Sequence, residues 1–246
     1  MSDGVGGRQP LEVGLLLCDQ LDADVAEVAG DYTHLYGTAY APAGIGFRIY
    51  DVTAGEFPSS TDECAAWMTS GSRHSAGDDL EWITRTREFI RALADERRPH
   101  VGICFGHQLT ALALGGRVDR AEVGWGVGVR HFDLVADAPW IDADATGFDI
   151  LMSHQDQVVE LPPDAELLAA ADYCPIGAYR VADHVFCVQG HPEFVPALSA
   201  TLAERRRARI GDETVDAALA SLSRPIDHAR IVGWIGRFYR AGGAPV

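Results

Sequence analysis

The stretch "VGICFGHQ", residues 101–108, places a cysteine between two glycines. An apolar run leads into it and the helix-like run "LTALALGG" follows, so it predicts a turn from a buried strand into a helix. The pattern G-x-C-x-G at such a turn has the form of a nucleophile elbow, in which a tight, strained backbone lifts the central side chain out of the sheet. Gly102 and Gly106 give the turn the small neighbours it needs. The simpler alternative is a buried cysteine in a glycine-rich turn.

An elbow here would give Cys104 the surroundings of a nucleophile. The helix that begins near Gly106 would favour the thiolate, because a helix N-terminus carries partial positive charge. The backbone N–H of Phe105 would face the oxyanion that develops when a thiolate attacks a carbonyl carbon.

A second motif, "QGHPEF" at residues 189–194, offers a base for that cysteine. In an extended segment, residues two apart point to the same side, so Glu193 would lie beside His191. The imidazole could then take a proton while the carboxylate holds its tautomer. An H-x-E pair alone is a weak signal, but with the elbow it predicts a nucleophile, a base and an orienting carboxylate in one chain.

The N-terminal half of the chain alternates between predicted strands and helices. Short apolar runs indicate buried strands at residues 11–18, 47–52, 65–72 and 100–105. Between the last two, the apolar spacing predicts a helix over 78–99, with Asp78 as its cap and Pro99 as its stop. A strand, a crossover helix and a further strand form a parallel unit.

The second half has a different pattern. Close-set apolar runs between residues 126 and 181 predict antiparallel strands added to the parallel sheet, and 184–194 predicts a last strand that runs into a turn. Residues 196–241 read as helical. Ile231, Ile235 and Phe238 form one stripe that we expect to pack on the sheet. The expected fold is therefore α/β, with a mostly parallel sheet flanked by helices, an antiparallel section and a C-terminal helical extension.

Composition narrows the possible classes of protein. The chain has 246 residues, of which 47% are hydrophobic, and no apolar run approaches the roughly 18 residues of a membrane span. The polar start "MSDGVGGRQP" has no signal-peptide pattern, which favours a cytoplasmic location. The net charge of −16 argues against nucleic acid as a partner. We expect the one basic cluster, "RRRAR" at 205–209, to be a solvated helix face opposite acidic neighbours.

Two residue types exclude particular chemistries. The chain contains no lysine, which excludes a Walker A lysine and a lysine Schiff base. In an ATP-dependent reaction, a lysine that binds phosphate would have to come from another chain. Its five cysteines are an odd number without a C-x-x-C pair, which argues against a disulfide framework or a zinc ribbon. We expect no metal and no cofactor, and we expect the remaining cysteines to be buried.

The motifs "GICFGHQ", "SHQDQV" and "QGHPEF", in this order and at these separations, resemble the class I, triad-type glutamine amidotransferase family. The resemblance covers roughly residues 11–195, and leaves 1–10 as a flexible N-terminus and 196–246 as a helical extension packed on the same domain. It implies a flavodoxin-like fold and hydrolysis of the glutamine side-chain amide. By this likeness Cys104 is the nucleophile, His191 the base and acid, and Glu193 the orienting carboxylate.

The resemblance also implies a binding site around the cysteine. The loop "TSGSRHS", residues 69–75, takes the place of the family's oxyanion loop, so the N–H groups of Gly71 or Ser72 would join that of Phe105. The implied substrate-binding residues are Gln108, Ser153, His154, Gln155 and Asp156. Two departures from the family pattern reshape the mouth of the site: Arg73 follows Gly71 and Ser72 where Gly-Gly-Pro is frequent, and Gln155 stands where glycine is common.

Three functions remain open on these grounds. In the first, the chain hydrolyses glutamine and releases ammonia for a separate synthetase subunit. In the second, it is a hydrolase or peptidase for a larger γ-glutamyl compound, whose carboxylate Arg73 could receive. In the third, it is a non-catalytic binding or regulatory module, against which the intact cysteine, histidine and glutamate argue.

Overall fold

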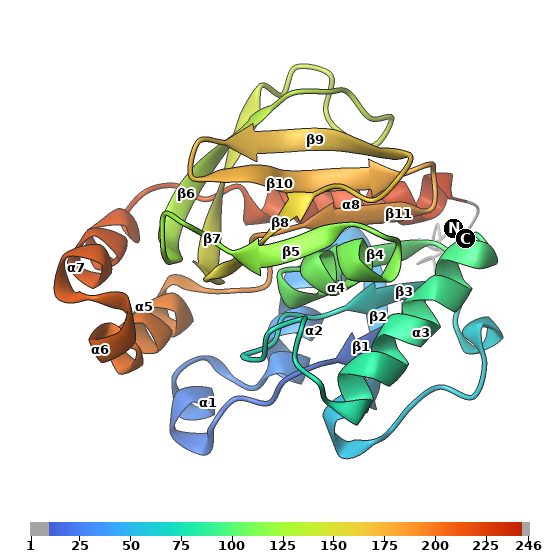
Figure 1. Ribbon diagram of the computed structural model, residues 1–246, viewed down its shortest axis with the longest axis horizontal. Coiled ribbons are helices and arrows are strands. Elements are labelled where there is room, and N and C mark those ends of the chain that lie inside the picture. Colours follow the sequence, from blue (N-terminus) through green and yellow to red (C-terminus); the bar gives the residue numbers. More distant parts are fainter. Residues whose placement is uncertain (1–9, 243–246) are drawn as a thin grey trace, which may run out of the picture.

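A single nine-stranded mixed sheet organises the computed structural model, which describes residues 10–242 (Figure 1). The strand order is β2-β1-β3-β4-β11-β10-β9-β6-β7. The parallel half consists of β2 (Ile45–Asp51), β1 (Leu11–Leu17), β3 (Ala66–Thr69), β4 (His100–Ile103) and β11 (Val185–Val188). The antiparallel half consists of β10 (Cys174–Val181), β9 (Ala165–Ala171), β6 (Gly126–Leu134) and β7 (Gly147–His154). The predicted α/β fold with a parallel core and an antiparallel addition is confirmed.

Helices pack on both faces of this sheet (Figure 1). On one face α3 (Glu81–Asp95) and α4 (Phe105–Ala113) share an apolar core with the strands, and on the other α2 (Tyr32–Tyr40) and α8 (His228–Ala241) do so. The predicted stripe of α8 is fully buried against the sheet, as expected from its spacing, through Ile231, Ile235 and Phe238. No helix within residues 10–242 is long and apolar enough to cross a membrane.

The shorter helices lie around the edges of the sheet. They are α1 (Ala23–Ala29), α5 (Pro196–Arg205), α6 (Arg207–Ile210) and α7 (Asp212–Ser221), with 3-10 turns η1 (Ala41–Ala43), η2 (Val52–Ala54) and η3 (Thr61–Glu63). Helices α1 and α2 were missed in the sequence, because α1 is short and α2 has a weak apolar periodicity. The expected flexible segment 1–10 lies outside the described residues apart from Pro10, and the division at residue 195 stays a prediction.

The helix predicted over 78–99 is shorter than expected. Its N-cap is Leu80, which makes no side-chain capping bond, and the helix ends at Asp95, ahead of Pro99. The Asp78 carboxylate does not cap α3, because its Oδ2 atom accepts a hydrogen bond from Ser75 N at 3.1 Å. The prediction of Asp78 as the cap was therefore wrong: the residue closes a turn in the preceding loop instead.

The apolar run 148–161 also divides in an unexpected way. It forms β7 and then β8 (Asp156–Glu160), and β8 pairs with β5 (Arg117–Arg120) in a separate two-stranded sheet. The break falls at Gln155, whose carbonyl oxygen accepts a hydrogen bond from Ala121 N at 2.9 Å. The expectation that this whole run joins the main sheet was wrong, since the chain leaves that sheet after His154.

Two helical glycines make a matched test of how closely α4 packs on the sheet. A Cβ atom on Gly106 would lie 2.3 Å from the backbone oxygen of Thr69 in β3, whereas one on Gly37 in α2 would meet no atom within 4 Å. We expect Gly106→Ala to lower the free energy of unfolding by about 1–3 kcal/mol through overpacking. Gly37→Ala should raise it by about 0.4–1 kcal/mol, because alanine loses less backbone entropy on folding. Urea denaturation measures both, and similar effects of the two changes would contradict the packing.

Candidate active site

The parallel strands deliver the predicted motifs to one edge of the sheet. Because β3, β4 and β11 are neighbours with the same direction, the loops that follow them meet at their carboxyl ends. Backbone hydrogen bonds join these loops: Gly106 N donates to Ser70 O at 3.1 Å, and Cys104 N donates to Val188 O at 3.0 Å. The first turn of α4 is thereby fixed to the loops on both sides.

Cys104 occupies the strained turn that the sequence predicts. Its backbone dihedrals are φ 51° and ψ −100°, in a region that residues with a side chain rarely adopt, and it directly precedes α4. The turn leaves no room for a larger residue at Gly102, where a Cβ atom would lie 2.6 Å from the Gly106 carbonyl oxygen. This geometry is that of a nucleophile elbow, with the sulfur at a helix N-terminus.

His191 and Glu193 form a buried hydrogen-bonded pair, with 2.7 Å between His191 Nδ1 and Glu193 Oε1. They are paired by a turn and not by an extended strand, because β11 has already ended at Val188. The ring of Phe194 stacks on the imidazole at a centroid distance of 3.9 Å, and His191 N donates to Leu151 O at 2.9 Å. The imidazole is therefore held by a carboxylate, an aromatic face and its own backbone.

Gly71 shows how close the imidazole lies to the cysteine. A Cβ atom built there would be 2.7 Å from His191 Cε1 and 3.7 Å from Cys104 Cβ, so both side chains border the same glycine. The neighbouring Ser72 lines the cleft that contains Cys104. Phe105 is the first residue of α4, so its N–H has no acceptor within the helix. The three predicted oxyanion donors thus belong to the loop and the helix turn next to Cys104, while their catalytic role stays a prediction.

Charge within the site favours a protonated histidine. Burial alone would lower the pKa of His191, but the charges of Cys104 and Glu193 and their hydrogen bonds raise it from 6.5 to about 10. The imidazole is accordingly an imidazolium at neutral pH, which suits a thiolate partner. Burial raises the thiol pKa of each of the other cysteines, which are Cys18, Cys64, Cys174 and Cys187.

A cleft of about 470 Å³ opens above the cysteine. Its lining includes Cys104 and Ser72. It also includes all the substrate-binding residues that the sequence predicts, which are Arg73, Gln108, Ser153, His154, Gln155 and Asp156. The Gln108 amide is fixed, since its Nε2 donates to Asp156 O at 2.7 Å and to Gln189 Oε1 at 3.1 Å. Burial lowers the pKa of His154 to about 3, so this residue enters the cleft wall as a neutral ring.

Arg73 does not present a free guanidinium to this cleft. Its Nε donates to Asp19 Oδ1 at 2.7 Å, its Nη1 to Asp22 Oδ1 at 3.2 Å, and its Nη2 to the carbonyl of Gln20. The two aspartates neutralise the charge of the Arg73 guanidinium, and these hydrogen bonds occupy its N–H donors. The arrangement does not favour the predicted use of Arg73 as a receptor for a substrate carboxylate.

The basic cluster at 205–209 differs from its expected role. Arg207 does face acidic neighbours, but Arg206 and Arg209 line the cleft, so the expectation of a wholly solvated face was wrong. The Arg206 guanidinium donates to Ser153 Oγ at 2.8 Å. The guanidinium carbons of Arg206 and Arg209 lie over the ring of Trp125, 5.9 Å and 5.6 Å from its centroid. Trp125 was not predicted as a site residue, because a tryptophan in a glycine-rich loop shows no helical or strand periodicity.

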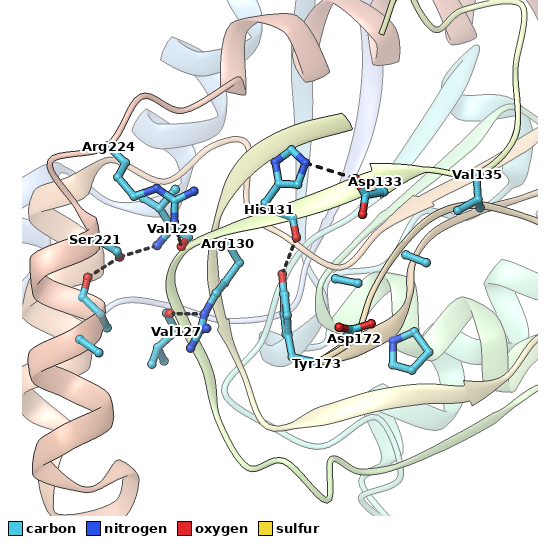
Figure 2. Close-up of a pocket in the computed structure, with 15 residues that line it drawn as sticks. Val127, Val129, Arg130, His131, Asp133, Val135, Asp172, Tyr173, Ser221 and Arg224 are labelled. Atoms are coloured by element: carbon cyan, nitrogen blue, oxygen red, sulfur yellow. Dashed lines mark hydrogen bonds and ion pairs between the residues drawn. The ribbon is translucent and has the colours of Figure 1, made fainter. Parts of the chain in front are cut away.

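A larger hollow of about 820 Å³ lies elsewhere, between β6, the β9–β10 turn and α7 (Figure 2). Several of its polar groups form structural bonds: Ser221 Oγ accepts from Val129 N and donates to Ala218 O, and Arg224 pairs with Asp149. Within the described residues, no group of His, Cys, Asp or Glu side chains could hold a metal ion. Chemistry therefore points to the smaller cleft at Cys104.

Comparison with known proteins agrees with this geometry. The family model for glutamine amidotransferase class-I matches residues 60–206. Gamma-glutamyl peptidase 3 of Arabidopsis thaliana is 32% identical over 178 residues, which are 69% of this chain and 72% of that protein. The glutamine-hydrolyzing GMP synthase of Aeropyrum pernix is 28% identical over 201 residues, 82% of this chain and 36% of that protein. A solved glutamine amidotransferase of Thermotoga maritima shares the fold, with a TM-score of 0.71 and 17% identity over 92% of this chain and 98% of that chain. The resemblance predicted from the motifs is confirmed: the chain belongs to the class-I glutamine amidotransferase family.

Proposed function

We propose that the protein hydrolyses γ-glutamyl amides larger than glutamine, through a γ-glutamyl thioester on Cys104. The observation that carries this proposal is the strained cysteine beside the His191–Glu193 pair, at the floor of a cleft of about 470 Å³. Clefts of this size accommodate ligands well above the size of a free amino acid. The named gamma-glutamyl peptidases, at 32% and 34% identity, support this function over the release of ammonia for a separate synthetase.

The proposed reaction has two halves. The Cys104 thiolate attacks the γ-carbonyl carbon, and the N–H groups of Phe105 and of the Gly71–Ser72 loop bind the resulting oxyanion. The His191 imidazolium gives its proton to the amide nitrogen, the C–N bond breaks, and the amine leaves. A water molecule then attacks the thioester while His191 takes its proton, the C–S bond breaks, and glutamate is released as the thiolate returns.

A substrate panel tests the proposal directly. We expect a higher kcat/KM for γ-glutamyl dipeptides than for L-glutamine, measured as released amino acid or ammonia. The competing function, release of ammonia for a separate synthetase, draws on the match to the GMP synthase. Glutamine as the better substrate would favour that function, and no turnover of any γ-glutamyl compound would overturn both.

Replacement of single cysteines separates chemistry from packing. Cys104→Ser should lower kcat by on the order of 10⁴-fold, because the hydroxyl is not ionised by the imidazole. Its thermal stability should be nearly unchanged, since one atom differs. Cys64→Ser, at a buried cysteine that does not line the cleft, is the control and should keep full activity. Equal loss in both variants would show that the residue at 104 acts through folding.

The pH profile reports the state of His191. Because the leaving nitrogen needs the imidazolium proton, kcat/KM should fall as the pH rises through about 10. The same protonation stabilises the fold: its contribution is complete below the ordinary pKa of 6.5 and is lost as the pH rises through about 10.

Glu193→Gln gives this profile its control. Removal of the carboxylate that raises the pKa of His191 should move the alkaline limb to lower pH and reduce kcat. Glu213→Gln, at an exposed position of α7, should leave both unchanged. An alkaline limb that stays in place in Glu193→Gln would refute the orienting role of Glu193.

A further inference from the structure

One wall of the active-site cleft carries two arginines that form no ion pair with an acidic side chain of the described residues. Five arginines line the cleft: Arg73, Arg120, Arg205, Arg206 and Arg209. The first three form ion pairs with aspartates. Arg206 and Arg209 form none with any acidic residue between 10 and 242, although the chain has 36 acidic residues against 20 basic ones. Their place in the lining of the cleft that contains Cys104 sets these two arginines apart from the other arginines without an ion pair in the described residues.

The surroundings of Arg206 indicate what it can bind. The side chain is half-buried, and this burial lowers its pKa, so it lacks part of the hydration that would stabilise its charge. One of its nitrogens donates to Ser153 Oγ, and its guanidinium carbon lies over the ring of Trp125, as does that of Arg209. Two like charges thus lie at one indole, and a bound anion would relieve their repulsion. A planar fork of N–H groups held in place by an aromatic ring matches the geometry of a carboxylate.

The two ends of a γ-glutamyl compound differ in charge. The γ-glutamyl head carries an ammonium beside its carboxylate, and two unpaired arginines would repel that ammonium. An amino acid attached through the scissile amide has no ammonium, because its nitrogen is acylated, so its carboxylate is a simple anion. Asp78, an aspartate of the cleft that forms no ion pair with an arginine of residues 10–242, provides negative charge that suits the ammonium of the head group.

We propose that Arg206 and Arg209, which lie over Trp125, bind a carboxylate of the leaving group, and so select γ-glutamyl compounds whose amine part is an amino acid or a peptide. This inference rests on the proposed function and adds the substrate class to it. Arg206, Arg209 and Cys104 line the same cleft of about 470 Å³, so one substrate can reach both the arginines and the nucleophile.

Three substrates test the inference: γ-glutamyl-alanine, its C-terminal amide, and L-glutamine. The amide keeps the shape of the dipeptide and lacks only the leaving-group carboxylate. We expect the unaltered protein to prefer the acid over the amide roughly ten- to a hundredfold in kcat/KM, the effect of one charge-assisted bidentate contact. Arg206→Gln should remove this preference by raising KM for the acid, with kcat little changed and with the amide and glutamine unaffected.

Further variants keep the test independent of folding. Arg206→Lys retains the charge without the fork and should recover only part of the preference. Arg209→Gln, at an exposed position, should lower the preference several-fold. The control is Arg207→Gln, since Arg207 pairs with Glu204 and Asp216 and does not line the cleft. It should behave as the unaltered protein.

The outcomes distinguish this inference from the proposed function. Equal turnover of acid and amide by the unaltered protein would overturn the inference and leave γ-glutamyl hydrolysis intact. Equal losses on all three substrates in Arg206→Gln would overturn it as well, because they would show that Arg206 binds the γ-glutamyl head. No turnover of either dipeptide would remove the proposed function and the inference together.

Discussion

The site depends on the backbone of Cys104, a side-chain-bearing residue held at φ 51° between β4 and α4. A residue in this conformation costs on the order of 1–3 kcal/mol, so it persists only where the surroundings determine it. Here they do so through contacts that admit no side chain, because a Cβ at Gly102 would strike the Gly106 carbonyl and one at Gly106 would strike Thr69. The same close packing brings the loops after β3 and β11 next to the cysteine. The strained turn and the arrangement of the neighbouring loops therefore depend on each other.

The charged groups around Cys104 are also arranged in a definite pattern. The chain has a net charge of −16, yet the cleft contains five arginines, three of which are neutralised by aspartates. In the buried part of the site, the raised pKa of His191 favours the imidazolium, which is hydrogen-bonded to the Glu193 carboxylate. Neutral groups, such as the Gln108 amide and the His154 ring, line the cleft together with the arginines. Positive charge is thus placed at two depths, one suited to a developing leaving group and one to an anion.

Sequence patterns predict the parts of this molecule that depend on local rules. Strands, the elbow and the buried stripe of α8 follow from apolar periodicity and from glycine positions, which act within a few residues. The orientations of side chains that depend on tertiary contacts could not be predicted from these local patterns. The Asp78 carboxylate, the Arg73 guanidinium and the side chain of Arg206 each have several partners within reach, and only the folded chain decides among them. The Glu193–His191 pair was anticipated from an extended spacing that the structure replaces with a turn.

The hydrogen bond from His191 N to Leu151 O has a consequence outside catalysis. Leu151 belongs to β7, the outermost strand of the antiparallel half, and an exposed outer strand is a template for pairing with another chain. The outward backbone groups in the middle of β7 have partners: Leu151 N bonds to His228, and both backbone groups of Asp149 bond to Asp227. The loop that carries His191 therefore also helps to cover an edge of the sheet, and loosening it would expose the protein to strand-by-strand aggregation.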